Sequence, residues 1–181
     1  MNAVEGPTVV GLDLSLRHTG IAYADGTTAT IETSDERGTN RLAIIRQAVR
    51  DALDVAEFLP DLVVVEGYSY HSRGRALFGL GELGGVVRLE LHDLGAPWAV
   101  LSPSALKKYA TGRHQANKTE MVVAARDRLG FEGVSDDQAD ALWLRAAGLA
   151  HMGAPLARMP KANQRALESL QLMVSPSTVE P

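Results

Sequence analysis

The chain has 181 residues and a formal net charge of −4, with 45% hydrophobic and 22% charged residues. This length fits one domain with a buried core, and the composition is ordinary for a globular protein. The absence of cysteine excludes disulfides and thiolate metal sites, so any metal must be bound by carboxylate or imidazole groups. No signal peptide or membrane span is recognisable in the sequence, so no membrane association is expected and the cytoplasm is the expected location.

The first 33 residues predict a three-strand antiparallel meander. The run at 8–15 is apolar and β-branched, which favours a buried strand. Segments 18–25 and 27–33 follow, and the Asp25-Gly26 pair between them is a strong hairpin signal.

Helix-like and strand-like patterns then alternate, which predicts an α/β fold with a mixed five-stranded sheet and helices on both faces. The expected helices lie at 39–58, 74–93, 104–112, 117–130 and 136–151, and the expected strands at 61–67 and 97–102. We therefore expect one domain over 1–153. Residues 154–181 are expected to be an extension, with an amphipathic helix at 161–173 and a flexible tail.

Four carboxylates lie in positions that suggest chemistry. Asp13 lies inside the apolar first strand, and Glu66 ends the apolar strand at 61–67. A charge in a buried strand is unfavourable unless it is paired or binds a metal. Asp137 and Asp140 share one face of the expected last helix. The four acids together predict a site for hard cations such as Mg²⁺ or Mn²⁺, of the kind that serves phosphodiester hydrolysis.

Each of these acids also has a purely structural explanation. Asp13 can pair with Arg17 or His18, and Glu66 can be a surface strand end. The acids of the last helix lie in its first turn, where the helix dipole favours negative charge. Asp136 has a suitable spacing from Asp140 as well, so spacing alone does not distinguish it from Asp137.

Basic residues concentrate in the middle of this acidic chain. Residues 67–128 hold nine Lys or Arg and only five Asp or Glu. Such a region can form one surface that faces phosphates, although scatter over solvated helix faces is an alternative. His18, His71 and His114 are candidates for acid/base groups, with placement in flexible loops as the alternative, and they are not expected to bind metal.

Six segments, in this order along the chain, resemble the RuvC-type Holliday-junction resolvases, which belong to the RNase H-like nucleases. The segments are GLDLSLRHTGIAY (11–23), VVVEG (63–67), LFGLGELGGVV (77–87), LSPSALKKYATG (101–112), ANKTEMV (116–122) and DDQADALWL (136–144). The resemblance implies an RNase H-like fold and a structure-selective endonuclease that cuts four-way junctions, and possibly flaps and forks. It also implies two Mg²⁺ ions, with Mn²⁺ as a substitute, and no organic cofactor.

The resemblance assigns roles to individual residues. It implies that Asp13, Glu66, Asp137 and Asp140 bind the metal, which selects Asp137 over Asp136. It places Lys107 and Lys118 beside the scissile phosphate, where without the family they would be taken as solvated surface. The DNA contacts it suggests are Tyr68, Tyr70, Arg73, Arg75, Lys108 and Arg113.

The family acts as a homodimer through the helix that matches 76–91. This would account for Gly79, Gly81, Gly84 and Gly85, because glycines inside a helix cost up to about 1 kcal/mol each and permit close approach of another backbone. Packing of this helix on its own sheet is the alternative explanation.

The chain also departs from the family. Aromatic residues flank, rather than occupy, the family's aromatic position after Glu66, and residues from 154 onward match no part of the pattern. We therefore expect a divergent member, plausibly encoded by a phage and active in the host cytoplasm. The competing hypotheses are an actin-like or sugar-kinase-type ATP-binding protein, for which the chain lacks a repeated domain, and a catalytically inactive DNA-binding dimer.

Overall fold

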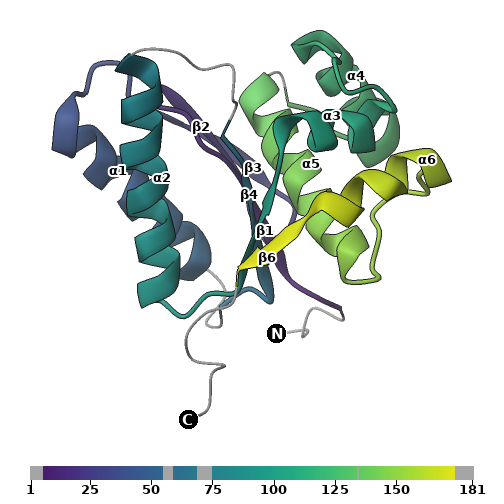
Figure 1. Ribbon diagram of the computed structural model, residues 1–181, viewed down its shortest axis with the longest axis horizontal. Coiled ribbons are helices and arrows are strands. Elements are labelled where there is room, and N and C mark those ends of the chain that lie inside the picture. Colours follow the sequence, from purple (N-terminus) through teal and green to yellow (C-terminus); the bar gives the residue numbers. More distant parts are fainter. Residues whose placement is uncertain (1–5, 55–58, 69–74, 134, 174–181) are drawn as a thin grey trace.

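Helices cover both faces of one mixed sheet (Figure 1). The computed structural model describes residues 6–54, 59–68, 75–133 and 135–173, and for Asp54, Arg75 and Ala76 it describes the backbone alone. The strands are β1 (Val9–Asp13), β2 (His18–Ala22), β3 (Thr28–Glu32), β4 (Leu62–Glu66), β5 (Trp98–Leu101) and β6 (Gln171–Met173). The helices are α1 (Gly38–Asp54), α2 (Arg75–Asp93), α3 (Pro103–Thr111), α4 (Lys118–Leu129), α5 (Asp136–His151), α6 (Lys161–Gln164) and the 3₁₀ helix η1 (Arg165–Ser169).

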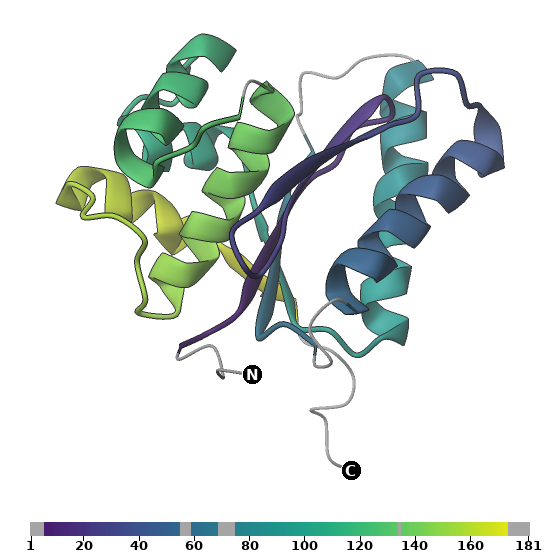
Figure 2. The ribbon, with the colours of Figure 1, turned by 180° about the vertical axis from the view of Figure 1, so that it is seen from behind.

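The strand order is β3-β2-β1-β4-β5-β6. Strands β1, β2 and β3 form the expected antiparallel meander, and β4 and β5 extend it in parallel with β1. The expected α/β class and the helices on both faces are confirmed. As Figures 1 and 2 show, α1 and α2 cover one face, while α3, α4 and α5 lie over the other.

Alternation along the strands divides the core in two. Val10 and Leu12 of β1 point toward α1 and α2, whereas Val9 belongs to the cluster under α5. In β4, Val63 and Val65 join the first cluster, and the intervening valine joins the second. Because successive side chains of a strand point to opposite faces, Asp13 and Glu66 both fall on the α5 face.

The C-terminal segment corrects two expectations. The sheet has six strands rather than five, because residues 171–173 pair antiparallel with β5. The expected helix over 161–173 is replaced by the short α6 and η1 followed by β6. The outer edge of β5 has backbone N–H and C=O groups that need hydrogen-bond partners. Pairing with residues 171–173 provides these partners, which a continuous helix over 161–173 would not do. The expected tail at 174–181 lies outside the described residues.

Local capping fixes the helices that surround the site. The Ser102 hydroxyl accepts a hydrogen bond from the Ala105 amide at the start of α3. Asn117 and Glu120 form a reciprocal capping box at the start of α4. Gly112 and Gly130 end these two helices with φ of 83° and 67°, a conformation that favours glycine. Among the helices that the structure describes, none is long and apolar enough to cross a bilayer.

One buried carboxylate links α1 to α2. Glu90 is only 3% exposed, and its Oε1 lies 2.5 Å from Nη2 of Arg50, while Arg46 approaches its Oε2 at 3.7 Å. We expect Glu90→Ala to lower the free energy of unfolding by about 2 kcal/mol, because the partly exposed arginines regain only part of the lost interaction from water. Urea unfolding measures this, with the exposed Glu82→Ala on the same helix as control. Equal stability of the two variants would contradict the expected role of the ion pair.

Candidate active site

Two of the predicted carboxylates lie side by side at the end of the sheet where the parallel strands β1 and β4 have their carboxyl ends. Strand β1 runs parallel to β4 with Leu12 opposite Val65, so the next residues, Asp13 and Glu66, lie level with each other. Both are at the carboxyl ends of their strands and both face α5. The two side chains are close enough to share a hydrogen bond. Neighbouring strands therefore bring together acids that are 53 positions apart in the sequence.

Helix α5 supplies the other two carboxylates from above the sheet. Its approach depends on glycine at two positions, because a Cβ on Gly11 would overlap the carbonyl oxygen of Ala141, and one on Gly20 would overlap that of Asp137. The helix backbone thus lies directly on β1 and β2. This contact brings Asp137 and Asp140, in the first turns of α5, over the ends of the strands.

The acids influence one another strongly. Burial, together with the charges of Glu66, Asp140 and Asp137, raises the pKa of Asp13 well above its ordinary value. Burial and the charge of Asp140 raise the pKa of Glu66 to about 7. Burial and the neighbouring aspartates also raise the pKa of Asp140 to about 7, and burial with Asp136 raises that of Asp137. The four predicted acids therefore form one electrostatic unit.

Two lysines lie near this cluster, the same two that the resemblance places beside the scissile phosphate. Lys107 of α3 lowers the pKa of both Glu66 and Asp140, so its ammonium group lies near the buried pair. Lys118, the first residue of α4, forms an ion pair with Asp136, and its side chain is 77% exposed. The positive charge around the acids thus comes from two separate helices.

Near the cluster lie three further residues, which the sequence analysis did not assign to it. Asp136 pairs with Lys118, and besides burial its negative charge contributes to the raised pKa values of Asp137 and Asp140. The Ser135 hydroxyl donates a hydrogen bond to Oδ2 of Asp137 at 3.3 Å. The charge of His18 lowers the pKa of Asp137. The position of His18 five residues after Asp13 was a signal, but only the β1–β2 pairing brings it to α5.

The donor set suits a hard divalent cation. All four groups are carboxylates, and Oδ1 of Asp140 is buried with no hydrogen-bond partner among the described residues. In the same part of the chain, no three Asp, Glu or His side chains converge tightly enough to enclose an ion as they stand. Binding therefore requires the side chains to rotate toward the ion, which would also relieve their mutual repulsion.

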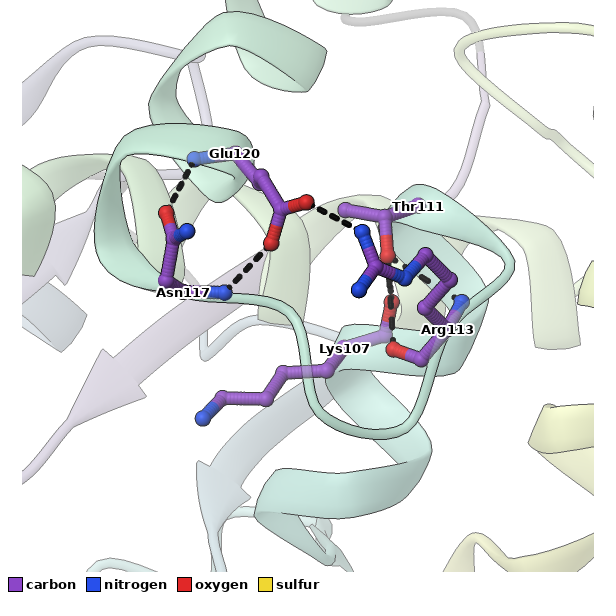
Figure 3. A network of polar contacts seen from close by, with 5 residues as sticks. All are labelled: Lys107, Thr111, Arg113, Asn117 and Glu120. Atoms are coloured by element: carbon purple, nitrogen blue, oxygen red, sulfur yellow. Dashed lines mark hydrogen bonds and ion pairs between the residues drawn. The ribbon is translucent and has the colours of Figure 1, made fainter.

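Of the six residues expected to contact DNA, the structure describes the side chains of three. Figure 3 shows Arg113 turned toward Glu120, with which it forms an ion pair, while the Lys107 side chain extends away from this network. Tyr68 lies against α2, with the guanidinium of Arg88 4.7 Å from its ring centroid. Lys108 lies on α3. Tyr70, Arg73 and the side chain of Arg75 lie outside the described residues.

The glycines of α2 face two environments. A Cβ on Gly79 would lie 2.8 Å from Cδ1 of Leu16, and one on Gly84 would overlap the Tyr68 hydroxyl, so these two permit packing within the chain. A Cβ on Gly81 or Gly85 would meet nothing within 4 Å. Packing within the chain, on the segments that follow β1 and β4, therefore accounts for two of the four glycines.

The raised pKa values predict how stability depends on pH. The folded metal-free protein holds protons at about pH 7 that the unfolded chain, with carboxyl pKa values near 4, has already released. Its melting temperature is therefore expected to fall as the pH rises from about 4 through about 7, and then to level off. Differential scanning calorimetry with EDTA measures this. In Asp140→Asn the fall should be smaller; a wild-type melting temperature that does not change over this range would contradict the coupling.

Comparisons with known proteins agree with this geometry. The family model described as "Crossover junction endodeoxyribonuclease RuvC" matches residues 6–149. The RuvC of Saccharopolyspora erythraea is 28% identical and covers 87% of this chain and 84% of its own. That of Paenarthrobacter aurescens is 32% identical and covers 75% and 77%. The structure "T. thermophilus RuvC in complex with Holliday junction substrate" matches with a TM-score of 0.66 at 22% identity, over 85% of this chain and 99% of that one, which shows a common fold.

Proposed function

Since the chain belongs to the RuvC family of crossover junction endodeoxyribonucleases, we propose that its four clustered carboxylates cleave Holliday junctions and related branched DNA by metal-dependent phosphodiester hydrolysis. This proposal rests on one observation: Asp13, Glu66, Asp137 and Asp140 lie together at the carboxyl ends of β1 and β4. The family and the intact acid set favour this nuclease over an ATP-binding protein or an inactive DNA-binding dimer.

The four carboxylates are the groups that would hold Mg²⁺, or Mn²⁺ in its place. When bound, two such ions would supply the Lewis acidity that polarises a phosphodiester and lowers the pKa of an attacking water. Asp13 and Glu66 offer their oxygens from the rigid ends of adjacent strands, while Asp137 and Asp140 do so from α5. The raised pKa values of Asp13 and Glu66 mean that the acids must give up protons as an ion binds, so metal affinity should increase with pH.

The two lysines are suited to the phosphate. Lys107 faces Glu66 and Asp140 in the metal-free protein, and cations bound there would leave its ammonium group available to the substrate. Lys118 is held at the first turn of α5 by Asp136. Positive charge fixed beside a phosphodiester stabilises the negative charge that develops during hydrolysis. Tyr68, Tyr70, Arg73, Arg75, Lys108 and Arg113 remain the proposed contacts to the DNA arms.

The exposed face of α2 supports a homodimer with one active site per subunit. Phe78 and Leu89 are 75% and 61% exposed, and Gly81 and Gly85 lie between them at helical spacing. Two large apolar side chains that flank a strip without side chains permit close packing against the same helix of a second copy. We propose that this face is the dimer interface.

The deciding experiment incubates the protein with a synthetic four-way junction, a flap and a linear duplex, with and without Mg²⁺. We expect paired, Mg²⁺-dependent incisions in the junction and little cleavage of the duplex. Cleavage of none of the three would contradict the nuclease function. Light scattering at micromolar concentration tests the dimer separately, with Phe78→Glu as the variant expected to be monomeric.

Two finer expectations also remain proposals. We infer a cytoplasmic location from the DNA substrate, while a phage origin stays a prediction. The division into a domain at 1–153 and an extension at 154–181 also stays a prediction, although α6, η1 and β6 pack against α3 and β5.

A further inference from the structure

The C-terminal segment forms one wall of a groove at the end of the sheet where the four acids lie. Val100 of β5 pairs with Gln171 of β6, so η1, which precedes β6, lies at the carboxyl end of β5. A groove of about 420 Å³ separates η1 from α3. Its far wall, with Arg165 and Ser169, belongs to residues beyond the 6–149 that the family model matches.

The groove is lined by groups that bind phosphate oxygens. Lys108 and Arg165 face it from opposite walls, and the imidazole of His114 also lines it. Among the residues that the structure describes, these three form no ion pair, whereas Arg113 and Lys118 nearby are both paired.

Hydroxyl groups and a helix end complete this set. Ser102, Ser104 and Ser169 contribute hydroxyls, and Ser102 stands at the positive end of the α3 dipole. Glu168 is the acid in the lining. Cationic side chains, serine hydroxyls and a helix N-terminus are the groups that commonly contact the DNA backbone.

The position of the groove in the fold gives its distance from the acid cluster. Glu66 ends β4, and the groove lies beyond β5 toward β6, which is about two strand spacings or roughly 10 Å away. One strand of B-DNA advances about 3.4 Å along the axis per nucleotide. A strand that leaves the acid cluster along this end of the sheet would therefore bring a phosphate within a few nucleotides of the cleaved bond to the groove.

We propose that this groove binds the DNA backbone within a few nucleotides of the cleaved bond, with Arg165 and Lys108 as its phosphate contacts. The proposal rests on the proposed nuclease function and adds a substrate-binding role for the C-terminal segment. It concerns affinity and placement of one DNA arm, since neither cation lies among the acids.

The test compares Arg165→Ala with Lys161→Ala, which removes an exposed cation of α6 outside the groove. Binding to a four-way junction is measured in EDTA, so that no cleavage occurs, over a range of salt concentrations. For Arg165→Ala we expect about threefold to tenfold weaker binding and a salt-dependence slope smaller by about one, the signature of one lost phosphate contact. Lys161→Ala should match wild type in affinity and in slope.

A shortened substrate locates the contact. In a set of junctions with one arm at a time cut back to the incision site and the other three arms intact, wild type and Arg165→Ala should bind equally when the missing arm is the one that reaches the groove. Unchanged affinity and slope for Arg165→Ala on the full junction, or equal losses for Lys161→Ala, would overturn the groove while leaving the nuclease function intact. Failure of the wild-type protein to bind or cut any junction would instead overturn the proposed function.

Discussion

Asp13→Asn is expected to lower the rate of junction cleavage by at least about a thousandfold while binding of the junction in EDTA stays within about twofold of wild type. Asparagine keeps the shape of the side chain but removes the charge that a cation needs. Loss of a metal site withdraws several kcal/mol of transition-state stabilisation, and each 1.36 kcal/mol corresponds to a factor of ten in rate.

The stability of this variant separates a catalytic from a structural effect. Asp13 is buried among like charges that raise its pKa, so removal of its charge should leave the metal-free protein at least as stable as wild type, above all above pH 7. The matched control is Asp127→Asn on the exposed side of α4, which should cleave at the wild-type rate. Undiminished cleavage by Asp13→Asn would show that the acids have been assigned wrongly.

A second large effect is expected from Gly20→Ala. The new methyl group would overlap the carbonyl oxygen of Asp137, and this backbone atom can move only with the first turn of α5. We expect a loss of about 2–3 kcal/mol in unfolding free energy, which is typical of an overpacked core. Because Asp137 and Asp140 move with the helix, cleavage should fall at least about a hundredfold even under conditions where the variant is folded.

Gly148→Ala is the control for this experiment. Its Cβ would press on Val64 and Val9 at the other end of the same helix, 2.7 Å from each. It should therefore lower stability while leaving the acids in place and the cleavage rate near that of wild type. Titration of Mn²⁺ by calorimetry adds a second readout, in which only Gly20→Ala should bind the ion more weakly. If folded Gly20→Ala binds Mn²⁺ and cleaves like wild type, the helix position does not depend on this glycine.

The sequence was sufficient for features with local causes. The apolar strands at β1 and β4 follow from β-branched runs, and the ends of α4 follow from Asn117 and Gly130. The places of Asp13 and Glu66 near the ends of these strands follow from the same runs. For these features, residues close in sequence carried the information, whereas the preference for Asp137 over Asp136 comes from the family pattern and stays a prediction.

The remaining features depend on contacts between distant segments. The ion pair of Lys118 with Asp136 joins two helices, and Glu90 is buried only because α1 brings Arg50 to it. The three residues of β6 carry too short a pattern to identify a strand, and they become one because the edge of β5 is free to accept them. No periodicity within a single segment contains such information.

The sixth strand has a consequence for the colloidal behaviour of the protein. In the described part of the chain, β6 occupies the outer side of β5. A chain shortened to end after α5 would keep all four acids but would expose the amides and carbonyls of β5, flanked by the apolar Trp98 and Leu101. Open strands of this kind recruit strands from other molecules. By covering this side of β5, the C-terminal segment is expected to protect the protein against aggregation. Shortened forms intended for crystallisation or assays should therefore retain residues 161–173.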